Sequence, residues 1–446
     1  MNRLMKRPLA FAALTALALI TVVPAASAMT IEKIVSPAGI PAWLVREQTV
    51  PLITLNYAFH GGSSQDSADK SGTANLTADM LDEGAGDLDS KMFHERMENH
   101  AIELGFRVGR DEFHGSLRAL NEHREEAFDL LKLALTTPRF DADAVERVRE
   151  QEVSGLRRDT TNPNTIASNQ WWSAAFPNHP YGRESKGTLE TLPRITADDL
   201  RDYVKRTFAR NELTISIVGD VDAKTAGELI DRAFGGLPAK NDLKPVAAVT
   251  PRGLGRRIVI NLDVPQAVVN FGGQGLARND PDFMAGYIVN HILGGGSFSS
   301  RLYREVREKR GLAYGVSDSL VWFKRAAVVI GGTATQADRT GDALAIIEAE
   351  TKRMAEEGPT ADELAAAKSF LKGSYALSLD TSAKIGAQLT QIQLDNLGVD
   401  YVTRRSSLID AVTLDDAKRA AKRLFGGGML VTVAGRPKGL SSSGTE

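Results

Sequence analysis

The sequence predicts an α+β fold with two homologous domains, each a mixed, mainly antiparallel sheet packed against several helices. Three observations lead to this prediction: the chain has 446 residues, strand-like runs mix with long amphipathic helices, and the pattern occurs twice. At roughly 150 residues per domain, the length favours two or three domains, each large enough to bury its own core. The repeat reduces that number to two.

The openings of the two halves match. The strand-like run 52–59 leads to a glycine pair at Gly61, and the run 267–271 leads to a glycine pair at Gly272, an offset of 211 residues. Both runs are apolar and rich in β-branched or aromatic residues, which favours strands. Each is followed by a helical stretch that stops at glycines, so both halves begin with a strand and a helix.

The endings of the two halves match more closely. Thr196 leads through Phe208 to an apolar run, and Thr413 leads through Phe425 to a similar one, with twelve residues from threonine to phenylalanine in both copies. Carboxylates follow each threonine, which is typical of an N-cap and the first turn of a helix. We therefore expect each half to close with a capped helix and a strand.

The segments between these repeats complete the prediction. Residues 111–120 alternate like a half-buried strand, and residues 141–158 form a charged amphipathic helix. A stretch rich in proline, glycine and charge separates the halves and is typical of a linker. The predicted organisation is a signal peptide, an N-terminal domain, a linker, a C-terminal domain and a flexible tail, at residues 1–28, 29–238, 239–257, 258–437 and 438–446.

The N-terminus predicts export. Arg3, Lys6 and Arg7 precede an apolar run over residues 9–23, and small residues ending in Ala-x-Ala occupy positions 24–28. This pattern is typical of a cleavable secretory signal and is short for a membrane span, although an uncleaved anchor is the alternative interpretation. We expect a mature protein in the periplasm, with no membrane span after cleavage.

Composition excludes several kinds of site. The chain has no cysteine, so it has no disulfide, thiolate zinc site, iron–sulfur cluster or cysteine nucleophile. With 54 basic and 56 acidic residues, it has no charge excess that would attract nucleic acid.

Several motifs in order resemble the insulinase/pitrilysin family of zinc peptidases, to which mitochondrial processing peptidase and the core proteins of the respiratory bc1 complex are related. The resemblance covers nearly the whole mature chain. Its motifs are Gly62-Ser-Ser, Phe176–Arg183, Gly187-Thr188, Val218–Asp222, Asp263–Gln266, Gly294–Leu302 and Arg307–Tyr314.

The resemblance implies a zinc site that this chain has lost. Active members carry His-x-x-Glu-His on a helix, where two imidazoles one turn apart hold zinc and the glutamate activates water. Here Asn75 replaces the first histidine, Ala78 the base and Asp79 the second histidine, while Gly155 takes the place of the third ligand. Glu152 is the nearest carboxylate to that last position. We expect no cofactor bound by this chain and zinc in a partner subunit.

Other metal sites are less favoured. The seven histidines form no pair four residues apart, and His179, which precedes a proline, favours a capping or packing role. Asp79, Asp82 and Glu83 could form a weak oxygen site, although a solvated helix end is the simpler interpretation.

The second half retains a functional pair by the same resemblance. Arg307 and Tyr314 match an arginine and a tyrosine that, in the family, contact substrate and stabilise the reaction's oxyanion at a zinc site in the facing domain. A guanidinium and a phenol can stabilise the negative charge of a tetrahedral intermediate. Further substrate-binding predictions are an edge strand around Phe113, which could add an extended peptide, and the turn of Gly294, Gly295, Gly296 and Ser297, which could line the cavity.

Taken together, the sequence predicts an exported non-catalytic subunit of a heterodimeric zinc metallopeptidase. Its partner would be a homologous subunit with an intact zinc motif, and its substrates would be peptides. The alternative is a peptide-binding or structural scaffold protein without a role in proteolysis. Independent peptidase activity is disfavoured because both histidines and the base are missing.

Overall fold

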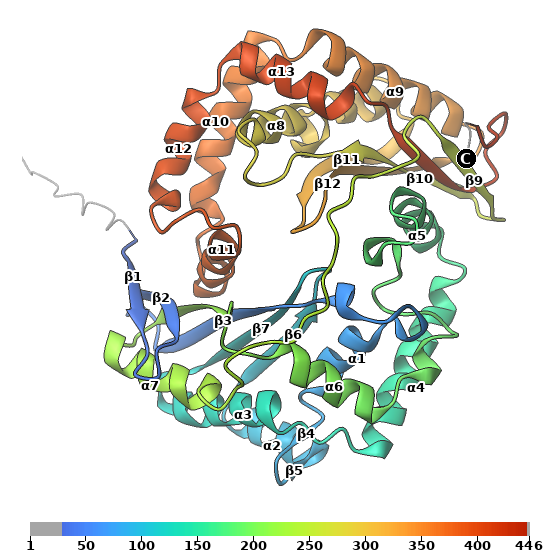
Figure 1. The fold of residues 1–446 in the computed structure, drawn as a ribbon. Coiled ribbons are helices and arrows are strands. Elements are labelled where there is room, and N and C mark those ends of the chain that lie inside the picture. The colour runs from blue at the N-terminus through green and yellow to red at the C-terminus, as the bar shows by residue number, and fades with distance from the viewer. Residues whose placement is uncertain (1–28, 444–446) are drawn as a thin grey trace, which may run out of the picture. The chain divides into compact units, whose positions relative to one another are not determined.

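The computed structural model describes residues 29–443, and the expected signal peptide of residues 1–28 lies outside them. The predicted α+β class is confirmed: two large mixed sheets are packed against helices, one sheet in each half of the chain (Figure 1).

The first sheet has six strands in the order β1-β2-β8-β3-β7-β6. Neighbouring strands are antiparallel, except that β2 and β8 run parallel. The strands are β1 Ile31–Val35, β2 Pro41–Arg46, β3 Leu52–His60, β6 Glu103–Val108, β7 Glu112–Leu120 and β8 Thr214–Gly219. β7 is therefore an interior strand, and the expected edge strand around Phe113 is wrong because β6 occupies the edge.

Apart from α5 (Pro163–Ala175), the helices of the first half lie on one face of this sheet and share its core. In this core, aromatic rings from β3 contact rings from α7 and from the C-terminal end of α6. Phe59 stacks on Phe208 with 4.7 Å between the ring centroids, and Tyr57 lies edge-on to Phe234 at 5.1 Å. The helices are α1 Thr73–Met80, α2 Ser90–Asn99, α3 Arg124–Thr136, α4 Ala142–Asp159, α5 Pro163–Ala175, α6 Ala197–Thr207 and α7 Ala223–Phe234, and a short hairpin pairs β4 Gly84–Ala85 with β5 Leu88–Asp89.

The second sheet has five strands in the order β11-β12-β10-β13-β9, with only the pair β13 and β9 parallel. The strands are β9 Arg257–Asn261, β10 Gln266–Gln274, β11 Ala313–Trp322, β12 Ala327–Gln336 and β13 Leu430–Gly435. The helices of this half are α8 Phe283–Asn290, α9 Thr340–Glu357, α10 Ala361–Leu377, α11 Ser382–Leu394, α12 Tyr401–Ala411 and α13 Leu414–Phe425.

The predicted repeat endings are confirmed in detail. Thr196 and Thr413 both form capping boxes, in which the threonine accepts from the third backbone N–H and Asp199 or Asp416 accepts from the threonine N–H. Each helix then leads to a strand next to the opening strand of its own sheet, β8 beside β3 and β13 beside β10.

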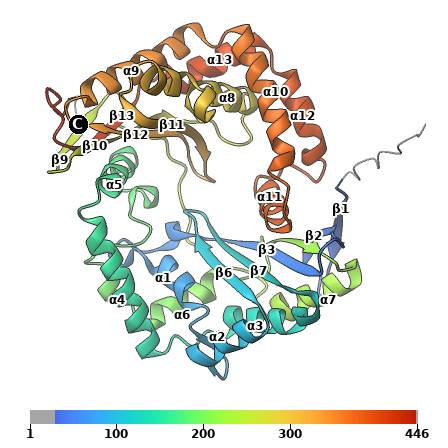
Figure 2. The same cartoon turned by 180° about the vertical axis from the view of Figure 1, so that it is seen from behind.

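Each sheet receives one helix from the other half on its second face (Figures 1 and 2). α5 packs on β10 and β13, where the Trp171 Nε1 donates to the Leu430 carbonyl at 3.0 Å. α11 packs on β3 and β8, where the Gln393 amide donates to the Ile215 carbonyl and to Ser216 Oγ. The two halves are thus bound to each other through buried polar contacts.

The C-terminal segment differs from the expected flexible tail. Ser443 pairs with Arg257 of β9 through two backbone hydrogen bonds of 2.8 Å, and Val259 donates to Ser442 Oγ. As far as Ser443, the tail therefore covers part of the β9 edge. Among residues 29–443, no helix combines the length and the apolar character that crossing a membrane requires.

Candidate functional site

Helix α1 begins at a buried carboxylate. The Asp66 carboxylate accepts hydrogen bonds from the backbone N–H groups of Gly72 and Ala74, each at 3.0 Å, and so satisfies two free donors at the helix start. Burial raises the pKa of Asp66 to about 7, although these N–H groups and Arg183 oppose the shift. Gly72 has a φ of 100°, and a Cβ there would lie 2.8 Å from the Lys186 carbonyl oxygen, so glycine is required on both counts.

The three positions of the degenerate zinc motif lie together on α1. Asn75 and Asp79 are one turn apart, and the Asn75 amide donates to the Asp79 carboxylate at 3.1 Å. The methyl group of Ala78 is buried in the core of this half. Asp79 is half-buried, and burial raises its pKa to about 7, with further contributions from the Glu152 and Asp82 carboxylates.

The fourth position lies on α4, which packs against α1. A Cβ at Gly155 would meet only the Arg158 Nη2, at 3.7 Å, which is ordinary van der Waals contact, so the position has room for a Cβ. An amide, a methyl group, one carboxylate and a glycine do not make the nitrogen-rich donor set of a catalytic zinc site. Within residues 29–443, no cluster of three histidine, aspartate or glutamate side chains could hold a metal ion.

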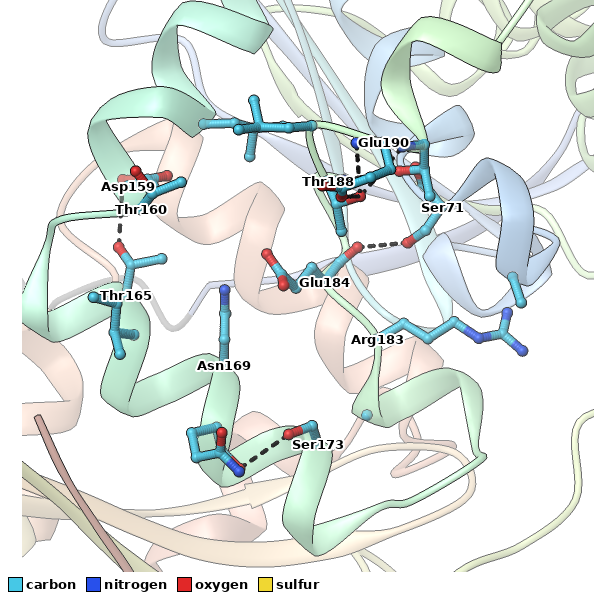
Figure 3. A pocket seen from close by; sticks show the side chains of 17 residues that line it. Ser71, Asp159, Thr160, Thr165, Asn169, Ser173, Arg183, Glu184, Thr188 and Glu190 are labelled. Atoms are coloured by element: carbon cyan, nitrogen blue, oxygen red, sulfur yellow. Dashed lines mark hydrogen bonds between the residues drawn. The ribbon is translucent and has the colours of Figure 1, made fainter. Parts of the chain in front are cut away.

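A polar pocket of about 570 Å³ borders this region, between the start of α1, the end of α4, α5 and the segment 182–191 (Figure 3). Glu184, Asp159 and Glu190 line it, together with hydroxyl and amide side chains. Burial raises the pKa of Glu184, and the other two carboxylates raise it further. The motif residues Arg183 and Thr188 also line the pocket, which sequence reasoning missed because its walls come from four separate segments.

The structure brings Arg307 and Tyr314 together. The Arg307 guanidinium lies over the Tyr314 ring at 4.4 Å and over the Tyr303 ring at 5.0 Å, within range of a cation–π interaction. Arg307 belongs to a π-helical turn, Tyr303–Glu308, which ends near Gly311 with a φ of 58°. Tyr314 is 86% exposed at the start of β11.

The charged side chains around this pair differ in whether they form ion pairs. Glu305 binds Lys309 and Arg310, and these contacts lower its pKa to about 2, Lys309 first, against the effect of burial. Arg307 forms no ion pair with any residue between 29 and 443 in the structure. Its charge is therefore held by aromatic rings alone and stays available to an incoming anion.

The predicted glycine turn is built around a buried carboxyl group. After α8 the chain forms a π-helical turn, His291–Gly295, and a Cβ at Gly294 would lie 2.6 Å from the Asp318 Cγ. Ser297 has a φ of 49°, which presents the next residue, Phe298, with 72% of its surface exposed. Phe298 lies edge-on to Tyr303 at 5.0 Å. The turn, which also includes Gly295 and Gly296, therefore places the exposed ring of Phe298 beside the Tyr303 ring that contacts Arg307. This exposed ring was not predicted from the sequence.

Phe113 is not a ligand-contacting residue. Its side chain is fully buried and packs against Phe208 and Phe106. The predicted main-chain pairing of a peptide with this strand is wrong, because β7 is already paired with β3 on one side and β6 on the other. The adjacent edge strand β6 contacts α1 and pairs only with β7 among the described strands. The free edge nearest the degenerate zinc positions is thus that of β6.

His179 caps a turn, as its sequence context predicts. Its Nδ1 accepts from the Tyr181 backbone N–H at 3.1 Å, and its Nε2 bonds to the Ala247 carbonyl at 3.0 Å. This histidine therefore has a structural role, and it connects the segment after α5 to the stretch between the halves.

Comparisons with known proteins agree with this architecture. The family model described as insulinase (peptidase family M16) matches residues 44–189, and the model described as peptidase M16 inactive domain matches residues 194–371. An uncharacterized zinc protease of Streptomyces coelicolor is 30% identical over 335 residues, which cover 73% of this chain and 72% of that protein. The non-peptidase homolog YmxG of Helicobacter pylori is 28% identical over 357 residues, 80% of this chain and 82% of the homolog.

Solved structures show the same fold. The crystal structure of a peptidase M16 inactive domain from Pseudomonas fluorescens has a TM-score of 0.86 and 27% identity, covering 94% of this chain and all of that one. A protease from Helicobacter pylori has a TM-score of 0.82 at 17% identity, covering 91% of this chain and all of that chain. By motif order, fold and similarity, the chain belongs to the insulinase family, peptidase family M16.

Proposed function

We propose that this protein is an exported, non-catalytic subunit of a zinc metallopeptidase, which binds peptides and supplies Arg307 and Tyr314 to an active homologous subunit. One observation carries the proposal. The helix that would hold zinc carries Asn75 and Asp79 bonded to each other, whereas Arg307 and Tyr314 are in contact, with Tyr314 exposed and Arg307 partly buried.

The exposure of Tyr314 argues for a role outside the fold. A tyrosine that is 86% exposed buries little apolar surface, so its ring contributes little to stability. The phenol and the guanidinium can both donate hydrogen bonds, and such donors stabilise the oxyanion that forms during peptide hydrolysis. The rings that hold Arg307 limit its motion, which reduces the entropic cost of presenting it.

Peptide binding is the second part of the proposal. An extended peptide could pair with the free edge of β6 by main-chain hydrogen bonds, because β6 lies beside α1. The pocket around Glu184 is lined by Ser71, next to the start of α1, and by three carboxylates, and could take a polar or basic side chain. Two similar proteins, a non-peptidase homolog from Helicobacter pylori and a peptidase M16 inactive domain from Pseudomonas fluorescens, support the non-catalytic part. Export to the periplasm is supported by the composition of residues 1–28.

The proposal is tested by mixing. The mature chain is purified alone and together with an insulinase-family chain from the same organism that has His-x-x-Glu-His, and cleavage of quenched fluorescent peptides is measured. We expect the mixture to cleave and the single chain not to cleave. Arg307→Met and Tyr314→Phe should each lower turnover of the mixture by about 10²-fold.

Controls separate chemistry from assembly. Arg304→Met is the matched control, because Arg304 lies on the same turn but pairs with Glu305 at 3.6 Å. The assembled mass and the melting temperature of all three variants should equal those of the parent. Cleavage unaffected by both substitutions would contradict the role of the pair, and peptide binding without cleavage by any mixture would favour a scaffold.

A further inference from the structure

A second pocket, of about 320 Å³, lies in the C-terminal half among α8, α10, α11, α12 and the end of β11. Its size falls at the lower end of small-molecule sites, and it would hold about ten water molecules. Five aromatic rings and two arginines contribute to its wall: Phe283, Tyr287, Trp322, Tyr375, Tyr401, Arg278 and Arg405. Nothing in the proposed peptidase role uses this pocket.

One of the two arginines is neutralised by the protein. Arg278 lies 3.7 Å from the Asp395 carboxylate, and both side chains are largely buried. Asp395 also accepts from the Trp322 indole N–H at 3.0 Å and from the Gln391 amide at 3.1 Å. This charge pair is therefore complete without a ligand.

The other arginine is not neutralised. Arg405 is only 7% exposed, yet it has no ion pair with a carboxylate anywhere in the described part of the chain. Its Nη1 donates to the Leu371 carbonyl at 2.9 Å, while its Nε and Nη2 have no acceptor among these residues. The guanidinium lies over the Tyr375 ring at 4.3 Å and near the Tyr287 ring at 5.8 Å. A buried cation without a counterion costs free energy that its ring contacts only partly offset.

Tyr375, whose ring contacts Arg405, also has a hydrogen-bond donor unused within the described residues. The Tyr375 hydroxyl is buried and has no hydrogen-bond partner among residues 29–443. Burial raises the pKa of Tyr375, so the phenol keeps its proton and acts as a donor. The pocket thus holds a guanidinium with one acceptor, the Leu371 carbonyl, and a phenol with none in the described part of the chain. A carboxylate is an acceptor with one negative charge and matches this set.

We propose that this pocket binds the carboxylate of a small organic acid or of a peptide C-terminus, with Arg405 as its charge partner and the aromatic rings around the apolar body. The ligand's charge would balance Arg405, and the phenol of Tyr375 would donate a second hydrogen bond. This inference does not depend on the peptidase role.

The test uses the full mature chain and defined probes. Calorimetry and thermal shift are measured with 3-phenylpropionate and with its neutral amide, and with the dipeptide Gly-Phe as the free acid and as the C-terminal amide. We expect the acids to bind and raise the melting temperature, and the amides to bind at least tenfold more weakly. Tighter binding of Gly-Phe would identify a peptide terminus as the source, and tighter binding of phenylpropionate a small acid.

Variants assign the effect to the pocket. Arg405→Met should weaken acid binding at least tenfold and leave the melting temperature of the free protein equal or higher, because an unpaired buried charge is removed. Arg404→Met is the matched control, since Arg404 is the adjacent residue but pairs with Asp400 at 2.8 Å. Tyr375→Phe keeps the shape and should weaken binding several-fold, which tests the pocket even if Arg405→Met does not fold. The proposal is overturned if the acids bind no better than the amides, or if binding survives both substitutions.

Discussion

The two halves of the chain share one fold, yet the polar side chains at their candidate site positions lie in opposite environments. On α1, Asp79 is half-buried, bonded to Asn75 and surrounded by other carboxylates. At the start of β11, Tyr314 is exposed, and the Arg307 guanidinium lies over the rings of Tyr303 and Tyr314. The first group is satisfied within the protein, and the second is presented outward. A shared fold therefore does not preserve chemistry in both copies, because each site depends on a few side chains that the sheet does not require.

The largest expected effect comes from rebuilding the first site. The substitutions Asn75→His, Ala78→Glu, Asp79→His and Gly155→Glu should create a tight zinc site with an apparent binding free energy of about 10 kcal/mol. A Cβ at Gly155 meets no atom closer than 3.7 Å, so a side chain can begin there without a clash. Metal analysis after dialysis, and competition with a chelator, would measure it. A folded variant that binds no more zinc than the parent would show that α1 and α4 are not in the family's arrangement.

A smaller effect is expected where the halves are joined. Trp171 is fully buried beneath β13, so Trp171→Ala should reduce the free energy of unfolding by about 3–5 kcal/mol. Trp172 is only partly buried and carries the Arg110 guanidinium on its ring at 3.9 Å, so Trp172→Ala should cost clearly less. Urea unfolding of both variants makes the comparison. Equal losses would mean that the contact of α5 with the second sheet is not a principal anchor.

The smallest effect concerns the charge of Asp79 and depends on pH. Its pKa is raised to about 7 in the folded protein, above the ordinary value near 3.9. Folding is therefore most favourable below pH 4, where the carboxyl group is protonated in both the folded and the unfolded chain. Stability falls as the pH rises through 7, because the folded protein must then hold the charged form. Asp79→Asn removes the charge and should be more stable than the parent at pH 8, by about 1–2 kcal/mol, with little difference near pH 4.

Unfolding curves of Asp79→Asn and the parent at the two pH values provide the measurement. Asp198→Asn is a suitable control, because the Asp198 side chain is 92% exposed and pairs with Arg201 on the surface. A difference between Asp79→Asn and the parent that is independent of pH would contradict the burial of this charge.

Local patterns predicted the fold well. The threonine caps at Thr196 and Thr413 need only a few neighbouring residues, and both appeared as capping boxes. The strand around Phe113 was also predicted, and its alternating burial is confirmed. Its place in the sheet was not, because strand order depends on pairing with β6, which carries no strong pattern of its own.

The candidate site was predictable only in part, for the same reason. The substitutions at Asn75, Ala78 and Asp79 are visible within a single helix. The contact of Arg307 with Tyr303 and Tyr314 depends on a π-helical turn that spacing does not reveal. The pocket around Arg405 combines five elements, and no short segment signals that a buried guanidinium there lacks a carboxylate.

The exchange of α5 and α11 has a consequence for biosynthesis. Gln393 bonds to a strand 178 residues earlier, and Trp171 to a strand 259 residues later. A chain that emerges from its N-terminus therefore completes its first sheet before the helix that covers the second face of that sheet exists. During that interval the uncovered strands can associate with other chains, and folding must wait for distant contacts whose loop-closure cost slows it. The crossing of two helices thus makes completion of the N-terminal half depend on synthesis of the C-terminal half.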